Sequence, residues 1–322
     1  MQVVAVDIGG THARFALAEV GDGRVRTLGE PTTLKTAEHA SFQSAWAAFA
    51  ASQPDPLPRA AAIAIAAPVK GDVLQLTNNP WVIRPALIPE QLGVDAHVLV
   101  NDFEAVGHAV AQVDDDALIH VAGPMGPLPA GGMTTIVGPG TGLGVAMLYR
   151  EGPRYHVIPC EGGHIEFAPL DAVEDAVLAD LRAKHRRVSA ERIVSGPGLA
   201  PIYNALARIE GREPTSLDDK ALWTAAFDGS DSLAATALDR FCLSLGSIAG
   251  DLALAQGANS VVIAGGLGLR LADRLPTSGF AERFTAKGRF QSMMAGVPVR
   301  LITHPQPGLL GAAAAFAREF SA

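Results

Sequence analysis

Two adjacent polar residues, Asn101 and Asp102, stand where a short apolar run of the sequence ends. The run, 98–100, is typical of a buried strand, and the residues after it have the spacing of an amphipathic helix. Ligands bind at the carboxyl ends of strands in open α/β sheets, so the pair indicates a binding or catalytic site. Helix capping is the alternative, because Asn101 followed three residues later by Glu104 is a variant of the capping box. A cap needs one such side chain and the sequence supplies two, which favours the site.

Glycine-containing turns at three predicted strand ends could bind phosphate. Glycine lets the backbone approach a phosphate closely and direct N–H groups toward it, and threonine adds a hydroxyl donor. Each turn could instead be an ordinary hairpin or helix-capping turn, but three together favour a nucleotide. None fits the P-loop, since no lysine follows the glycines, and GPGTGLG precedes an apolar strand rather than the helix of a dinucleotide fingerprint. The turns contain Gly9, Gly10 and Thr11, then Gly138, Gly140, Thr141, Gly142 and Gly144, and finally Gly265 and Gly266.

Asp7 lies inside the first apolar strand, just before the first glycine turn. A carboxylate in that position is costly unless it is paired or faces a cation. Holding a hydrated Mg²⁺ beside nucleotide phosphates is one explanation. Acceptance of hydrogen bonds from the N–H groups of the turn is the other, and the residues alone do not separate the two.

The loop CEGGHIEFAP places further polar groups around two glycines. It contains Glu161, His164 and Glu166, and Glu191 follows in SAERIVSGPG. A histidine flanked by carboxylates suggests a metal, but no cysteine or second histidine stands at the spacing of a zinc ligand. Carboxylates and an imidazole also suit the vicinal hydroxyls of a sugar, where each hydroxyl needs a donor and an acceptor. Either stretch alone is more often structural.

Strands and helices must position these residues, and their alternation along the chain favours an α/β architecture. Phe42, Trp46 and Phe49 share one face of a helix predicted over 33–53. The segment 235–258 has the length and spacing of a long, mostly buried helix.

The N-terminal pattern of strand, turn and strand starts again after a loop rich in Gly and Pro at 122–133. An alignment without gaps of Gly10-Thr11 on Gly140-Thr141 places Ala16 on Ala146. A fold built from two related halves would produce this repetition.

Composition excludes several classes of protein. The chain has 322 residues, a size that suggests two domains, and is 48% hydrophobic and 18% charged, as in a globular protein. Its net charge of −8 gives no reason to expect nucleic acid or an anionic membrane as a partner. Cys160 and Cys242 cannot form a disulfide framework. The sequence shows no secretory signal and no apolar run of roughly 20 residues, so we expect a cytoplasmic protein.

A series of motifs resembles, in order, those of the bacterial glucokinase family. They extend from about Val3 to about Ala315 and read VDIGGTHAR, TNNPW, NDFEAV, GPGTGLGV, EGGHIEFAP, SAERIVSGPGL, IAGG and PGLLGA. The resemblance implies the two-domain actin-like ATPase (ribonuclease H-like) fold, with a cleft between a small and a large α/β domain. It implies a small domain over 1–112, completed by a C-terminal helix at about 306–322, and a large domain over 113–305.

The resemblance also implies ATP-dependent phosphorylation of glucose at its 6-hydroxyl. Asp102 matches the catalytic base, and Asp7 matches the carboxylate that reaches Mg²⁺ through water. The positions that match sugar-binding residues are Asn101, Asp102, Glu161, His164 and Glu191. Those that match ATP-binding residues are Asp7, Gly9, Gly10, Thr11, Gly138, Gly140, Thr141, Gly142, Gly265 and Gly266. A homodimer and closure of the cleft on sugar binding are further implications.

Two departures from related sequences bear on these expectations. His12 follows Thr11 where glucokinases commonly have asparagine, which can change the contacts of the first loop. The cysteine-rich zinc motif of the related ROK sugar kinases and repressors is absent, so the resemblance favours the zinc-free branch, with His164 on the sugar.

Three alternatives remain at this stage: a kinase for another hexose, a sugar-sensing transcriptional regulator, and an actin-like ATPase that switches a partner protein. The regulator usually has an added DNA-binding module, whereas the first strand here begins at Val3. The sugar-binding set argues against the switch.

Overall fold

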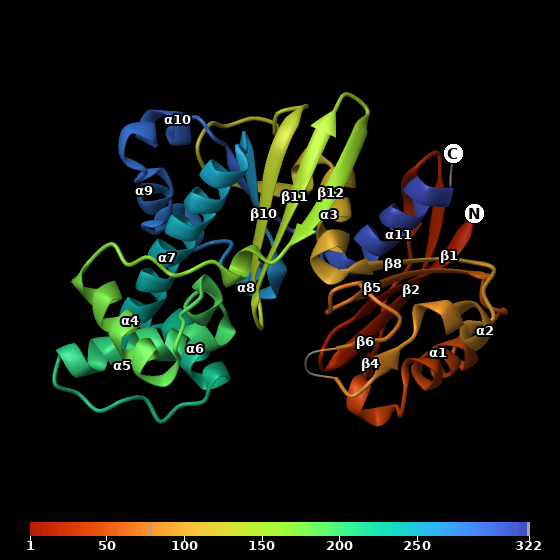
Figure 1. Cartoon of the computed structure of the whole chain (residues 1–322), viewed down its shortest axis with the longest axis horizontal. Helices are drawn as coiled ribbons and strands as arrows, with labels where there is room; N and C mark the ends of the chain where they lie inside the picture. The colour runs from red at the N-terminus through yellow and green to blue at the C-terminus, as the bar shows by residue number, and fades with distance from the viewer. Residues whose placement is uncertain (77–78, 321–322) are drawn as a thin grey trace. The chain divides into compact units, whose positions relative to one another are not determined.

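Two six-stranded sheets organise the chain, one in each of two units (Figure 1). The computed structural model describes residues 1–76 and 79–320, so Thr77 and Asn78 of the TNNPW motif lie outside the described residues. Unit 1 comprises Met1–Asp114, Val157–Pro159 and the C-terminal segment from His304. Unit 2 comprises Asp115–His156 and Cys160–Thr303.

The sheet of unit 1 has the strand order β3-β2-β1-β5-β8, with β4 paired to β2. Strands β1, β5 and β8 run parallel, and β2 returns antiparallel to β1. Its strands are β1 (Gln2–Ile8), β2 (His12–Gly21), β3 (Arg24–Leu28), β4 (Thr32–Lys35), β5 (Ala60–Ile65) and β8 (Ala96–Asn101), and β6 (Leu74–Gln75) and β7 (Val82–Ile83) form a separate pair. Its helices are α1 (Phe42–Ala51), α2 (Ile88–Leu92), α3 (Asp102–Gln112) and α11 (Pro307–Phe320).

Helices cover both faces of this sheet because successive apolar side chains along its strands point to opposite faces. Val4 and Val6 of β1 belong to the core that includes the aromatic residues of α1, whereas Val3 and Ala5 belong to the core with α11. In Figure 1, α11 in dark blue lies against the red strands, so the C-terminal helix packs on the N-terminal strands. The backbones of α11 and α3 are in contact at Gly311, where a side chain would overlap the Ala105 carbonyl of α3.

The helix predicted over 33–53 is too long at its N-terminal end. Residues Thr32–Lys35 form β4, and α1 begins only at Phe42, where Ser41 makes a capping box. Pairing of β4 with β2 decides this conformation, since a tertiary contact overrides a helical pattern.

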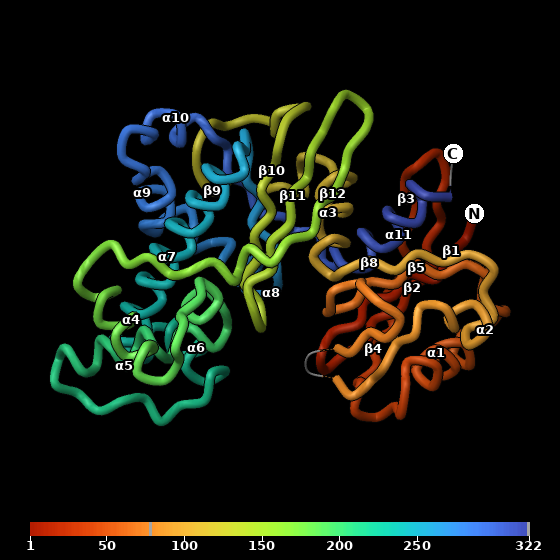
Figure 2. The backbone as a smooth tube through the Cα atoms, viewed as in Figure 1, coloured from red at the N-terminus to blue at the C-terminus, as the bar shows by residue number. Residues whose placement is uncertain are grey.

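The sheet of unit 2 has the order β12-β11-β10-β13-β14-β9, and Figure 2 traces its backbone. Its strands are β9 (Leu118–Ala122), β10 (Gly132–Pro139), β11 (Leu143–Glu151), β12 (Arg154–Cys160), β13 (Ser260–Ile263) and β14 (Val299–Ile302), of which only Val157–Pro159 of β12 are grouped with unit 1. Its helices are α4 (Ala172–Lys184), α5 (Leu199–Ile209), α6 (Asp219–Asp228), α7 (Ser232–Gln256), α8 (Gly265–Arg270), α9 (Phe280–Thr285) and α10 (Gln291–Ala295). The long buried helix predicted over 235–258 is confirmed as α7, whose residues form much of the core.

Within the described ranges 1–76 and 79–320, every helix is too short or too polar to cross a membrane.

Candidate active site

Asn101 and Asp102 lie at the junction of β8 and α3, and their side chains have different structural roles. Asn101 caps α3: its side-chain oxygen accepts hydrogen bonds from the N–H groups of Phe103 (2.9 Å) and Glu104 (3.3 Å), and Glu104 accepts from the Asn101 N–H. The capping interpretation is therefore confirmed for Asn101. Asp102 is the first helical residue, and its carboxylate accepts from the Phe103 N–H at 2.9 Å.

The Asp102 carboxyl group lies in an environment that opposes ionisation. Burial, and next the charge of Asp7, raise the pKa of Asp102 from 3.8 to about 6, against the opposing effect of hydrogen bonds from Phe103 and Asn101. A carboxyl group with this pKa is ionised at neutral pH and can still take up a proton. Such a perturbed group at a strand end is a candidate for acid–base chemistry.

Asp7 lies on β1 beside the same carboxyl edge of the sheet, since β1, β5 and β8 are parallel and in register. Its carboxylate lies 3.3 Å from Arg14, the residue opposite it on β2, and its side chain is 20% exposed. Burial raises the pKa of Asp7, and Arg14 opposes that shift. In the described part of the chain, no N–H of the adjacent turn donates to this carboxylate.

Gly308, near the start of α11, leaves the space that Asp7 needs. A Cβ atom at Gly308 would lie 2.7 Å from the Asp7 carboxylate. The N-terminal end of α11 therefore approaches the half-buried Asp7 carboxylate, an arrangement that the helix dipole favours.

The turn of Gly9, Gly10 and Thr11 is held by its carbonyl groups. The Gly9 carbonyl accepts from Asn79, and Thr36 donates to the carbonyls of Gly10 and Thr11. Over residues 1–76 and 79–320, the N–H groups of Gly10 and Thr11 have no hydrogen-bond acceptor. Adjacent free N–H groups of this kind form an anion-binding concavity.

The second predicted turn joins β10 to β11. The Gly140 N–H bonds the Gly142 carbonyl at 2.8 Å, and the Gly140 carbonyl accepts from Gly196 at 2.7 Å. The N–H groups of Thr141 and Gly142 have no acceptor in the described residues.

Gly265 and Gly266, predicted as a turn, are the first two residues of α8. Gly265 has a φ of +79°, and a Cβ atom there would lie 2.6 Å from the Pro139 carbonyl, next to Gly138. Two of the three predicted glycine segments are therefore in contact within unit 2. Gly266 faces open space, since no heavy atom other than those of its chain neighbours and of the α8 backbone lies within 4 Å of where its Cβ would be.

Glu161, His164 and Glu191 come together around the start of β11. Glu191 accepts a hydrogen bond from the Leu143 N–H at 2.9 Å. Gly163, between Glu161 and His164, packs on the Leu143 carbonyl so closely that a side chain would not fit. The Glu161 and His164 side chains are 71% and 55% exposed, and their nearest oxygen and nitrogen lie 4.0 Å apart.

The structure adds residues that the sequence analysis missed. Arg14 and Gly308 act on Asp7, and Arg187 donates to the His164 carbonyl at 2.6 Å. Of these, Arg14 and Gly308 lie in motifs of the family resemblance, VDIGGTHAR and PGLLGA, whereas Arg187 lies outside them. In the described ranges, no three His, Cys, Asp or Glu side chains are grouped closely enough to hold a metal ion.

Known proteins resemble this chain over nearly its whole length. The family model described as Glucokinase matches residues 4–319. A glucokinase of Zymomonas mobilis is 64% identical over 321 residues, covering 100% of this chain and 99% of the relative. A glucokinase crystal structure from an Antarctic psychrotroph is 34% identical, covers 98% of both chains and has a TM-score of 0.85.

A more distant structure agrees in fold. The ROK family glucokinase from Streptomyces griseus, solved in complex with glucose and AMPPNP, has a TM-score of 0.61 at 18% identity, covering 98% of this chain and 99% of that one. The two-domain actin-like ATPase fold expected from the sequence is confirmed. With the family model and a close relative both matched from end to end, the chain belongs to the glucokinase family.

Proposed function

We propose that the protein transfers the γ-phosphoryl group of ATP to the 6-hydroxyl of glucose, with Asp102 as the catalytic base. ATP-dependent phosphorylation of glucose is the activity of the family to which the chain belongs. The observation that supports Asp102 is the division of roles at the start of α3. Asn101 caps the helix, so Asp102 is not needed for that purpose, and its pKa of about 6 suits a group that takes up a proton.

A carboxylate is too weak a base to ionise a sugar hydroxyl before the reaction. Phosphoryl transfer passes through a loose transition state in which bond formation to the nucleophile lags. Asp102 therefore needs only to orient the hydroxyl and accept its proton late. A group placed in this way typically contributes about 10²–10⁴-fold to the rate.

The residues that would bind glucose are Asn101, Asp102, Glu161, His164 and Glu191. Asn101 uses its side-chain oxygen for the cap, and its amide group donates to the Ala67 carbonyl and to the Asp102 carboxylate, so a sugar hydroxyl would share one of these amide hydrogens. Glu161, His164 and Glu191 contact the other hydroxyls. A sugar that leaves such groups unpaired would be rejected.

The glycine segments bind ATP in this proposal. The free N–H groups of Gly10, Thr11, Thr141 and Gly142 are suited to phosphate oxygens. The S. griseus relative in complex with AMPPNP supports a nucleotide triphosphate as the donor. The full set is Asp7, Gly9, Gly10, Thr11, Gly138, Gly140, Thr141, Gly142, Gly265 and Gly266.

Asp7 fits a role toward Mg²⁺. Mg²⁺ is commonly bound through one or two carboxylates, several waters and the phosphates of the substrate. The space that Gly308 leaves beside Asp7 and the free N–H groups of the neighbouring turn suit that arrangement. The ion would neutralise charge on the transferred group, and Asp7 would hold it through water.

We further propose that the protein is a cytoplasmic homodimer, as the family resemblance implies. Light scattering of the purified protein tests the dimer, and a mass of one chain would contradict it.

Sugar-dependent release of ADP tests the proposed reaction. The purified protein is given Mg-ATP and glucose, mannose, fructose, N-acetylglucosamine or N-acetylmannosamine in turn. We expect strong turnover with glucose. Preference for another sugar would contradict the assignment of glucose, and no turnover with any sugar would contradict the kinase activity.

A further inference from the structure

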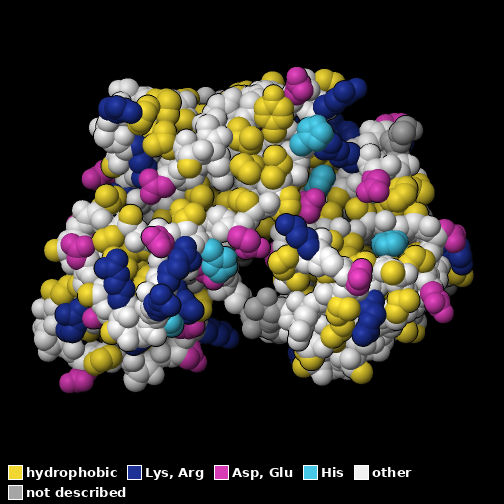
Figure 3. All heavy atoms as spheres, viewed as in Figure 1, with side chains coloured by type: hydrophobic (Ala, Val, Ile, Leu, Met, Phe, Trp, Pro, Cys, Tyr) yellow, Lys and Arg dark blue, Asp and Glu magenta, His cyan; other side chains and the backbone are white. Residues whose placement is uncertain are grey.

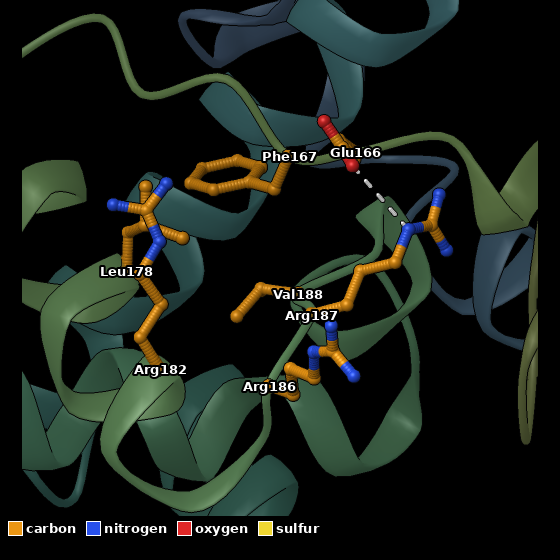
Figure 4. Close-up of a pocket in the computed structure, with 7 residues that line it drawn as sticks. All are labelled: Glu166, Phe167, Leu178, Arg182, Arg186, Arg187 and Val188. Carbon is orange, nitrogen blue, oxygen red and sulfur yellow. Dashed lines mark hydrogen bonds and ion pairs between the residues drawn. The ribbon is translucent and has the colours of Figure 1, made fainter.

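Unit 2 contains a cavity of about 450 Å³ beside the Glu161–His164 loop that the proposed function does not use (Figure 4). Arg182 enters it from α4, and Arg186 and Arg187 enter from the segment that follows this helix. Figure 3 shows that basic side chains gather on the surface of unit 2 over α4. Three guanidinium groups therefore surround one cavity, although the net charge of the chain is −8.

The charges of the cavity are only partly compensated. Among the described residues that line it, Glu166 is the one acidic residue, and it pairs with Arg187 at 3.4 Å. Arg182 and Arg186 have neither a hydrogen bond nor an ion pair within the described residues. Three arginines and one glutamate give the lining a net charge of +2.

We propose that this cavity binds a small phosphate monoester. Such a group carries a charge of about −1.5 to −2 at neutral pH, which matches the lining, and the planar fork of arginine suits phosphate oxygens. The cavity is large enough for an organic body as well, since ligand sites span about 300–1,000 Å³. Phe167, Leu178 and Val188 provide an apolar wall for that body.

Arg187 connects this cavity with the sugar loop. It donates to the His164 carbonyl at 2.6 Å and pairs with Glu166. A bound phosphate competes with Glu166 for this guanidinium group and so shifts the loop that carries Glu161 and His164. Ligand binding therefore changes the KM for glucose, a consequence that rests on the proposed sugar contact of His164.

Calorimetry with phenyl phosphate tests the site directly. The whole protein is first saturated with glucose and Mg-AMPPNP, so that the proposed active site is occupied. We expect one binding event with a Kd below about 1 mM, weakened at least about tenfold in the double variant Arg182→Gln, Arg186→Gln. The control is Arg289→Gln, which removes the same charge from a residue that stacks on the Phe290 ring outside the cavity lining, and it should bind like the wild type.

Equal binding by the double variant and the wild type would overturn the proposal, as would no binding to the wild type at about 10 mM.

Kinetics then test the connection to the sugar loop. Saturating phenyl phosphate should change the glucose KM of the wild type at least about twofold and leave that of the double variant unchanged. An unchanged KM in the wild type overturns the connection, and since the calorimetry needs no turnover, its result stands apart from that of the proposed reaction.

Discussion

The hairpin β1–β2 of unit 1 and the hairpin β10–β11 of unit 2 share the same strand arrangement but have different residues at the ends of their strands. The five-strand orders β3-β2-β1-β5-β8 and β12-β11-β10-β13-β14 match strand for strand, and each hairpin places its first strand parallel to the next strand of the sheet. The order of burial along β2 from Ala13 also repeats along β11 from Leu143 for seven residues. Two related halves, as the repeated sequence predicted, explain this agreement.

The two turns differ by one residue. Ile8 pairs with Ala13 around a turn of four residues, whereas Pro139 pairs with Leu143 around a turn of three. The alignment without gaps is therefore correct for the second strands and wrong by one position for the first. With the strands matched by their pairing, Asp7 corresponds to Gly138.

This difference separates the contributions of the two units. The pair Asp7 and Arg14 in unit 1 corresponds to Gly138 and Gly144 in unit 2. Unit 1 therefore places charged groups at the carboxyl edge of its sheet. The corresponding positions of unit 2, Gly138 and Gly144, have no side chains, and Gly265 packs beside Gly138. Substitutions of charge in unit 1 should change the reaction, and substitutions of glycine in unit 2 should change nucleotide binding or folding.

Replacement of Asp102 by asparagine should have the largest effect. The amide cannot accept the proton, so kcat should fall by about 10²–10⁴-fold, measured as ADP release with saturating glucose and ATP. Glucose binding and folding should persist, because Asn101 retains the cap.

The matched control is Asn101→Ala, which removes the cap and keeps the carboxylate. It should lower the free energy of unfolding by about 0.5–2 kcal/mol and leave part of the activity. A variant Asp102→Asn that does not fold, or that loses less than about tenfold in kcat, would contradict the role of base.

The variant Asp102→Asn should also be more stable than the wild type at high pH. Because the pKa of Asp102 rises from 3.8 to about 6 on folding, the folded state holds its proton more tightly, and stability falls as the pH rises between these values. The cost at pH 8 is at most about 3 kcal/mol. Asp102→Asn should therefore raise the midpoint of urea unfolding at pH 8 and change it little below pH 4, and equal differences at both values would contradict this.

Gly265→Ala tests the contribution of unit 2. A side chain at φ +79° costs about 1–2 kcal/mol, and contact with the Pro139 carbonyl adds to that cost, so Tm should fall. Gly266→Ala is the matched control, because its side chain would enter open space. It should fold normally and raise the KM for ATP by about tenfold if that space holds the nucleotide. A KM for ATP that stays unchanged in Gly266→Ala would exclude Gly266 from the nucleotide site.

Most elements and the candidate residues could be predicted from the sequence, because local patterns determine them. Periodicity identified α7, and the glycines marked the turns. The helix over 33–53 was wrong at its start because pairing of β4 with β2 is a contact between distant segments.

The interactions within the site could not be predicted, for the same reason. The partner of Asp7 depends on strand register, which places Arg14 opposite it. The need for glycine at 308 depends on where α11 packs, far along the chain. The sequence therefore indicated candidate residues for the site but not the partners with which the structure places them.

Arg14→Gln should have the smallest effect. Arg14 opposes the rise that burial imposes on the pKa of Asp7, so its loss raises that pKa further. The Arg14 side chain is 39% exposed, which screens the interaction. We expect kcat/KM for Mg-ATP to change by less than about twofold at pH 8 and to fall more steeply than in the wild type as the pH is lowered. Arg26→Gln, which breaks an exposed pair with Asp22, should give the wild-type profile. A large loss at pH 8 would instead mean that Arg14 itself contacts the transferred phosphate, and the charge contributed by unit 1 would then include a cation.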